Sequence, residues 1–273
     1  MWLKFRPLAY QHHPYKWATI GKEISHIEDA TMDDVKDFFF THYVPNNAVL
    51  VVAGNVETQK VKALAEKWFG PIPAGKKKRR ELPAEPVQRE SGFLKVEADV
   101  PADAFYMGFP MAGRFDADYY AADLMSDVLG RGESSRLYET LVKDKALFTS
   151  LSSYVMGTID PGLLIISGRV KEGVSIEDAE KAVWDVLQQF MRDGVGEREL
   201  EKVKNQAEST IVFGETEVMN RAMGLAFASL SGDANLINEE SALIKKVTAA
   251  EIKAMAQQLL QKEKSTVLHY VGK

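Results

Sequence analysis

The end of this chain repeats its beginning, and the repeat limits the folds that the chain can adopt. When Leu8 is placed on Leu225, the two stretches correspond without a gap as far as Phe38 and Met255. The matched positions carry similar residues, for example Leu8-Ala9-Tyr10 with Leu225-Ala226-Phe227, Ile20 with Ile237, Glu23 with Glu240 and Ile27 with Ile244. Self-similarity of this kind is typical of tandem copies of one structural unit.

Both copies continue into the same expected elements. Thr31 and Thr248 each stand before an amphipathic segment and have an acidic residue three positions on, which indicates a capped helix. A β-rich run follows in each copy, Ala48–Val52 in the first and Thr266–Tyr270 in the second. The two copies are therefore expected to share one order of elements.

The copies differ in how much sequence precedes the capped helix. Only 30 residues stand before Thr31, whereas a long, apparently continuous domain stands before Thr248. We therefore expect residues 1–75 to be the C-terminal half of a truncated first domain, 76–91 a linker, and 92–273 a complete second domain. This interpretation places the rest of the first domain upstream of Met1.

The pattern of apolar residues predicts an α+β fold with tandem homologous domains, in which helices pack on one face of a mixed or antiparallel sheet. The expected strands are 48–53, 93–99, 104–109, 148–156, 162–170 and 266–271. The expected helices are 31–43, 57–69, 116–129, 136–145, 175–193, 197–213 and 216–231. Because the first copy lacks strands to flank 48–53, we expect it to expose a sheet edge and an apolar helix face with Phe38, Phe39 and Leu64.

Composition narrows the class of function. The chain is 45% hydrophobic, 27% charged and carries a net charge of -5, which gives no general attraction to nucleic acid. Its one basic run, Lys76–Arg80, lies between prolines and is interpreted as solvated linker. No apolar run is long enough to span a bilayer. The absence of cysteine excludes disulfides and thiolate sites and fits bacterial cytoplasm or periplasm, of which we favour periplasm.

The residues offer no catalytic, cofactor-binding or metal site. Zinc hydrolysis usually needs two histidines one helical turn apart and an acid, but His12 and His13 are adjacent, and His26, His42 and His269 stand alone. No serine-nucleophile motif is present. The glycine-rich segment Gly130–Arg136 lacks the ending of a phosphate-binding loop, so we interpret it as the start of a helix.

Several motifs in order resemble the pitrilysin/insulinase-type zinc metallopeptidases over essentially the whole chain. In the first copy these are His13-Pro14-Tyr15, Ile20-Gly21, Thr31–Val35, Tyr43–Val56 and Trp68–Pro73. In the second they are Leu129–Tyr138, Asp160-Pro161-Gly162 and Gly194–Gln206. The resemblance implies a zinc motif, His-x-x-Glu-His, that would lie upstream of Met1 together with a third acidic ligand, so His12 and His13 cannot be assigned as ligands.

The resemblance further implies a parent enzyme that cleaves peptides in a chamber between two homologous domains, with this portion contributing wall rather than chemistry and inactive alone. Its expected partners are peptide substrate, the missing N-terminal domain and a second peptidase-like chain in a dimer. The alternative is a non-catalytic, peptidase-like scaffold or partner subunit of a heteromeric processing complex.

The sequence departs from the family at a substrate clamp. Family members often place an arginine and a tyrosine after the Ser-Ser-Arg-Leu helix, where this chain has Val142 and Thr149. Two interpretations remain open. Either the parent borrows the clamp from a partner chain, or these positions have simply diverged.

Overall fold

The computed structural model describes residues 1–76, 81–86 and 90–273. Part of the expected linker therefore lies outside the described residues, including residues 77–80 of the basic run. Two compact units are present. The first contains Met1–Ala18, Pro83–Ala207 and Ala242–Lys273, and the second contains Thr19–Leu82 and Glu208–Ser241.

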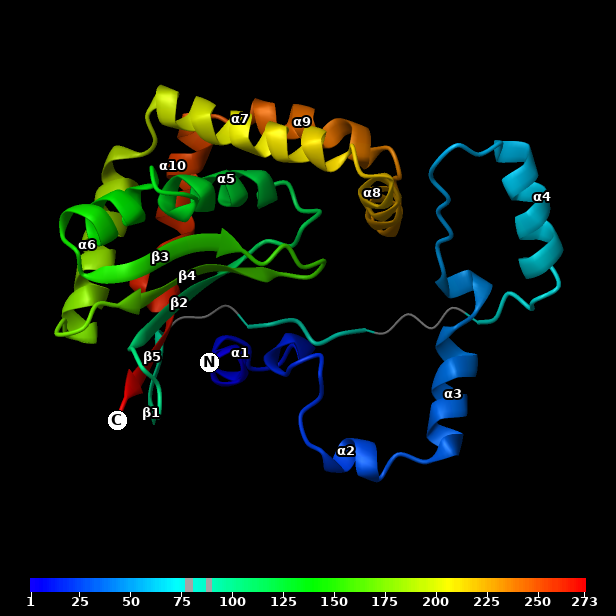
Figure 1. Ribbon diagram of the computed structural model, residues 1–273, viewed down its shortest axis with the longest axis horizontal. Helices are drawn as coiled ribbons and strands as arrows, with labels where there is room; N and C mark the ends of the chain where they lie inside the picture. The colour runs from blue at the N-terminus through cyan, green and yellow to red at the C-terminus, as the bar shows by residue number, and fades with distance from the viewer. Residues whose placement is uncertain (77–80, 87–89) are drawn as a thin grey trace. The chain divides into compact units, whose positions relative to one another are not determined.

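The first unit is built on a five-stranded mixed sheet of order β1-β5-β2-β4-β3 (Figure 1). Its strands are β1 Gly92–Ala98, β2 Ala104–Met111, β3 Phe148–Val155, β4 Gly162–Val170 and β5 Thr266–Gly272. β5 pairs parallel with β1 and antiparallel with β2, while β4 pairs antiparallel with both β2 and β3. The expected strands of the second copy are thus confirmed, and its last strand does pair into the sheet.

One face of this sheet is covered by helices, as the sequence predicts. α5 packs on β3 and β4, and α10 packs on α5, α6 and β2. Besides α1, Trp2–Ala9, the α-helices that contribute to the first unit are α5 Tyr119–Gly130, α6 Ile176–Asp193, α10 Ala249–Leu259 and parts of α7 Glu197–Gly214 and α9 Leu236–Lys246. α6 shows why they form: Ser175 caps it by accepting from the backbone N–H of Asp178, and its apolar residues lie on one side.

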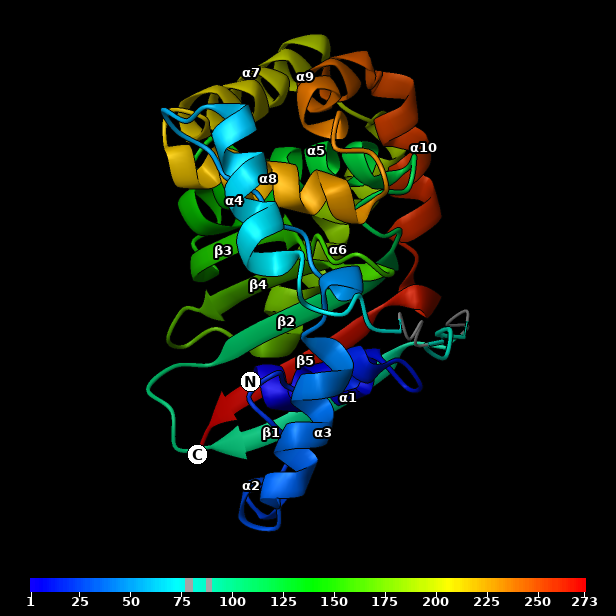
Figure 2. The same cartoon turned by 90° about the vertical axis from the view of Figure 1, so that its right-hand side faces the viewer.

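The opposite face of the sheet is covered by α1, Trp2–Ala9, from the first repeat copy (Figure 2). α1 packs against β1, β2 and β5. The buried members of this contact are Phe5, Ala9, Tyr10, Leu163, Ile165 and Leu268, and Trp2, Tyr15, Leu94, Val96, Tyr106 and Met156 pack around them. Successive strand residues point to opposite faces, so β4 contributes Leu163 and Ile165 to this contact while Leu164 and Ile166 face the other way.

Over its described residues, the second unit holds helices and no strand. Its complete α-helices are α2 Ser25–Glu28, α3 Met32–His42, α4 Thr58–Phe69 and α8 Val218–Leu230, and it also contains the remaining parts of α7 and α9. Thr31 and Asp34 form a complete capping box on α3, matching the one that Thr248 and Glu251 form on α10. No helix of the described residues is both long and apolar enough to cross a membrane.

The strand expected at 48–53 is absent from the described structure. Its sequence has strand character, but a strand is stabilised by backbone hydrogen bonds to a neighbour, and a lone extended segment has none. The expected exposure of the apolar helix face is confirmed, because Phe38, Phe39 and Leu64 are all exposed.

The compact units cut across the repeat copies. Residues 1–18 of the first copy pack with the second-copy sheet, and residues 208–241 of the second copy group with residues 19–82. The expected domain boundaries, 1–75, 76–91 and 92–273, were derived from the sequence repeat and not from compactness. They stay a prediction. The structure adds that each unit contains sequence from both copies.

The contact of α1 yields a stability prediction. Phe5 is 0% exposed and lies so close to Gly108 that a Cβ there would stand 2.7 Å from the Phe5 ring. We expect Phe5→Ala to lower the free energy of unfolding by about 3 kcal/mol or more, because it leaves a cavity under the sheet. Leu3→Ala, on the same helix at 65% exposure, is the matched control and should change little. Equal effects of the two variants in chemical denaturation would contradict the packing described.

Candidate functional site

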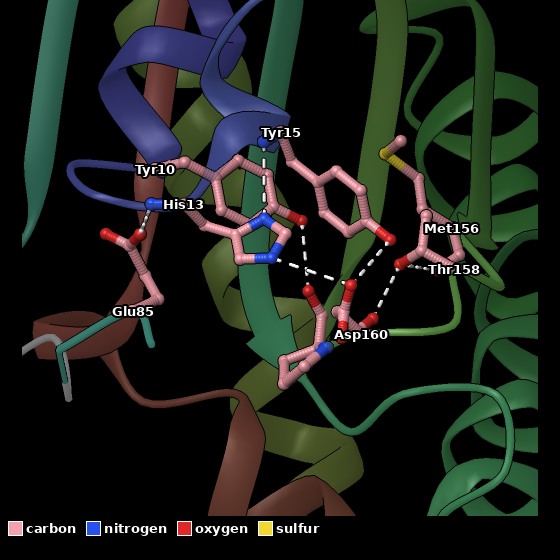
Figure 3. Close-up of polar contacts among 8 residues, drawn as sticks. Tyr10, His13, Tyr15, Glu85, Met156, Thr158 and Asp160 are labelled. Atoms are coloured by element: carbon pink, nitrogen blue, oxygen red, sulfur yellow. Dashed lines mark hydrogen bonds and ion pairs between the residues drawn. The ribbon is translucent and has the colours of Figure 1, made fainter. Parts of the chain in front are cut away.

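The His-Pro-Tyr motif forms a tight turn directly after α1. His13 is buried and precedes the short helix Pro14–Lys16, and its Nδ1 accepts a hydrogen bond from the backbone N–H of Tyr15 at 3.2 Å (Figure 3). The Nε atom of Arg6 also donates to the carbonyl oxygen of Tyr15, at 2.6 Å. The side chain of His13 thus acts as a helix cap, which fixes the shape of the turn.

The turn is held against the β3–β4 connection. His13 Nε2 lies 3.6 Å from an Asp160 carboxylate oxygen, and the Tyr15 hydroxyl donates to the same oxygen at 3.5 Å (Figure 3). The Tyr10 hydroxyl donates to the carbonyl of Pro161 at 3.4 Å, and burial raises the pKa of that phenol far above its ordinary range. The His-Pro-Tyr and Asp-Pro-Gly motifs, far apart in the sequence, therefore meet in space.

Glu85 binds the same turn from a third segment. Its carboxylate accepts hydrogen bonds from the backbone N–H groups of Gln11, His12 and His13, the last two at 3.0 and 2.7 Å. Partial burial acts to raise the pKa of Glu85, but the three N–H donors stabilise the charged form more strongly and lower it overall. Three successive backbone donors on one carboxylate form an anion-binding nest.

The cluster of His13, Tyr15, Glu85 and Asp160 contains residue types that occur in active sites, but it is not arranged as a catalytic or metal site. Both ring nitrogens of His13 face protein groups: Nδ1 accepts from a backbone N–H, and Nε2 faces the carboxylate of Asp160. Within the described ranges, no group of three or more His, Cys, Asp and Glu residues could hold a metal ion. The geometry is that of a set of polar contacts joining two loops. We call this set, made by His13, Tyr15, Glu85 and Asp160, the polar lock.

The glycine-rich segment also has a structural role. Arg136 makes a two-pronged ion pair with Glu199, at 2.8 and 2.7 Å, and donates to the carbonyl of Gly194 at 2.9 Å. Its guanidinium lies over the ring of Phe190. Burial acts to raise the pKa of Glu199, but Arg136 outweighs it and the pKa is lowered. The segment expected to begin an α-helix leads into a π-helix, Tyr138–Asp144.

The remaining predicted positions do not converge on the lock. Val142 is half-buried in the π-helix, and Thr149 is exposed on β3, where its hydroxyl donates to the carbonyl of Arg169. His269, expected to stand alone, is buried on β5 and lies 2.8 Å from Glu180. The sequence analysis missed the roles of Glu85, Glu180 and Glu199. Each pairs with a residue more than 60 positions away, so local spacing carries no signal for it.

The nest at Glu85 predicts a pH-dependent contribution to stability. Since the folded-state pKa is lowered, the contribution is complete above the ordinary glutamate pKa of about 4.3 and is lost as the pH falls toward the folded-state value. We expect Glu85→Gln to reduce the free energy of unfolding at neutral pH and the difference from the parent chain to shrink in acid. Denaturation at several pH values measures this, with Glu81→Gln as control. A difference that is independent of pH would contradict the role of the charge.

Comparison with known proteins confirms the resemblance. The family model described as "Peptidase M16 inactive domain" matches residues 29–207. The zinc protease PqqE of Helicobacter pylori is 30% identical over 207 residues, which cover 75% of this chain and 46% of that protein. The chain spans about half the length of the curated relatives it matches.

Solved structures share the fold. A protease from Helicobacter pylori superposes with a TM-score of 0.88 at 24% identity, covering 99% of this chain and 66% of that one. A chain of complex III from Candida albicans superposes with a TM-score of 0.82 at 16% identity, covering 99% of this chain and 65% of that one. With a family model matched over most of its length, the chain belongs to the M16 family of zinc peptidases, within which it corresponds to the inactive, peptidase-like domain.

Proposed function

We propose that this chain is the C-terminal, non-metal-binding portion of a zinc metalloendopeptidase that cleaves peptides in a chamber between two homologous domains. The observation that supports the proposal is that the motifs that resemble the family make structural contacts in this chain. His13, Asp160, Arg136 and Glu199 are all engaged in contacts that fix loops and helices to one another. Side chains held in this way would form a rigid wall of the chamber.

The zinc site of the parent would come from residues that precede this chain. The curated relative PqqE is named a zinc protease, and less than half of it is covered by the match. The family resemblance implies a zinc motif in the part of the first domain ahead of the His-Pro-Tyr turn. We propose that this chain contributes the sheet and helices on the far side of the substrate from that metal.

The proposal predicts how zinc and activity divide between the chain and its complete gene product. The 273-residue chain, purified and dialysed, should contain no stoichiometric zinc and hydrolyse no peptide. The complete gene product should hold about one zinc and lose peptidase activity when chelated. Metal analysis and a fluorogenic peptide assay on both proteins provide the measurement. Chelator-sensitive activity in the 273-residue chain alone would contradict it.

A non-catalytic scaffold is the second candidate function. Its support is the likeness in fold to a chain of complex III from Candida albicans. A complete gene product that binds no zinc under conditions that load a known member of the family would favour the scaffold. The two candidates are thus separated by the metal content of one protein.

Val142 and Thr149, at the positions of the substrate clamp, indicate what a partner chain would have to supply. Val142 has no polar side-chain atom, and the Thr149 hydroxyl donates to a strand carbonyl, so neither can replace an arginine or a tyrosine toward a peptide. We propose that the parent obtains this clamp from a second peptidase-like chain. Full peptidase activity of the complete gene product as an isolated monomer would instead favour simple divergence at these positions.

A further inference from the structure

A cavity of about 570 Å³ lies between one side of α6 and the segment that joins α10 to β5. The buried part of its lining contains Glu180, Trp184, Met191 and Leu260, of which Trp184 and Leu260 are almost fully enclosed. The lining residues at its rim are exposed. All of these residues belong to the first unit. A cavity of this size can hold a small organic molecule or one side chain of another protein.

Two hydrogen bonds fix the carboxylate of Glu180 on the wall of this cavity. One of its oxygens lies 2.8 Å from Nε2 of His269 on β5, and the other accepts from the indole N–H of Trp184 at 3.2 Å. His269 points toward α6 because its neighbour Leu268 points to the opposite face of the sheet, under α1. The negative charge of Glu180 is therefore held in one place.

Neither hydrogen-bond donor balances this charge. The indole of Trp184 is neutral. Nδ1 of His269 is buried beside the rings of Phe93 and Phe105, and it has no hydrogen-bond partner among the described residues. A protonated ring would carry an N–H at that atom with no acceptor, which is costly in a buried place. The neutral ring, with its one N–H directed at Glu180, is therefore favoured.

The rim of the cavity does not balance the charge either. Glu177 at the rim forms an ion pair with Lys95, at 3.2 Å. The other charged rim residues among the described lining are two lysines and two acids, Lys181, Lys262, Asp185 and Glu263, and all are exposed. Because these four offset one another, the charge of Glu180 is left without a counterpart.

Glu180 also has capacity for a further hydrogen bond. Burial acts to raise its pKa, but the hydrogen bonds from His269 and Trp184 outweigh burial and the pKa is lowered, so the group is charged at neutral pH. A carboxylate offers about four lone-pair sites, and these two hydrogen bonds occupy only part of them. A cationic donor that entered the cavity could use the remainder.

We propose that this cavity is a binding subsite for an alkylammonium group, whose N–H donors bind the Glu180 carboxylate while its alkyl stem packs on Trp184 and Leu260. Tryptophan is the aromatic side chain that interacts best with cations. The apolar lining, to which Met191 also contributes, suits a chain of methylene groups. Free amines and the lysine side chains of peptides both carry this chemistry.

Titration of the 273-residue chain with n-pentylamine, which is an ammonium ion at neutral pH, tests the subsite. We expect saturable binding in calorimetry and a shift of the Trp184 indole N–H resonance in NMR spectra. The isosteric n-pentanol should bind at least about tenfold more weakly, because it lacks the charge that strengthens a hydrogen bond to a carboxylate.

Three variants locate the binding. Glu180→Gln should weaken binding of n-pentylamine by at least about tenfold. Asp185→Asn is the matched control, since it removes an exposed carboxylate from the same helix, and it should change the affinity by less than about threefold. Lys262→Gln should tighten binding by about two- to threefold, because the charge of Lys262 acts on Glu180 and would repel the ligand.

Three results would overturn the subsite. These are equal weakening by Glu180→Gln and Asp185→Asn, equal affinity for n-pentylamine and n-pentanol, and unchanged or weaker binding in Lys262→Gln. The last two comparisons decide the matter even where Glu180→Gln fails to fold. A purely structural role of Glu180 predicts no tighter binding in Lys262→Gln.

A peptide ligand distinguishes the two sources of the ammonium group. If acetyl-Ala-Lys-Ala-amide binds as tightly as n-pentylamine, the subsite accepts a lysine side chain of a peptide. If n-pentylamine alone binds, the subsite is one for free amines. Absence of binding for both ligands contradicts the subsite. These measurements require neither zinc nor residues outside this chain, so their outcome is independent of the proposed function.

Discussion

The packing of α1 on the sheet is the contact on which the rest of this structure depends. A sheet that is apolar on both faces needs a layer on each, and the helices α5, α6 and α10 supply only one. Without α1, the apolar residues that β1, β4 and β5 direct to the second face, Leu94, Leu163 and Leu268 among them, would meet water. The same helix carries the His-Pro-Tyr turn at its end, so the packing of Phe5 also places His13 beside Asp160.

Most strands and helices of the second copy could be predicted because they rest on local pattern, although α9 was missed. Alternating apolar residues located β1 and β2, runs of β-prone residues located β3, β4 and β5, and Thr248 with Glu251 located the start of α10. The prediction of a strand at 48–53 was wrong although the segment has the composition of a strand, because a strand also needs neighbouring strands for its backbone hydrogen bonds. The position of α1 could not be predicted, since nothing local to Trp2–Ala9 indicates that it will cover a sheet built by the second copy.

The lock around His13 shows a similar division. The sequence identified His13, Tyr15 and Asp160 as members of motifs. It could not bring the motifs together, because the turn and the Asp-Pro-Gly connection join through tertiary contacts such as that between His13 and Asp160, residues far apart in the chain. Glu85 accepts hydrogen bonds from three backbone N–H groups. It lies in the segment that was predicted to be a linker, and no sequence pattern indicated this role.

Hydrogen exchange of α1 tests the central claim most directly. An isolated helix of eight residues is marginal in water, so slow exchange in Trp2–Ala9 can come only from packing on the sheet. We expect the amides of Phe5, Leu8 and Ala9 in the 273-residue chain to be protected to an extent similar to those of β1, which α1 covers. Exchange of these amides as fast as in a freely frayed terminus would show that the first-copy helix does not cover the second-copy sheet.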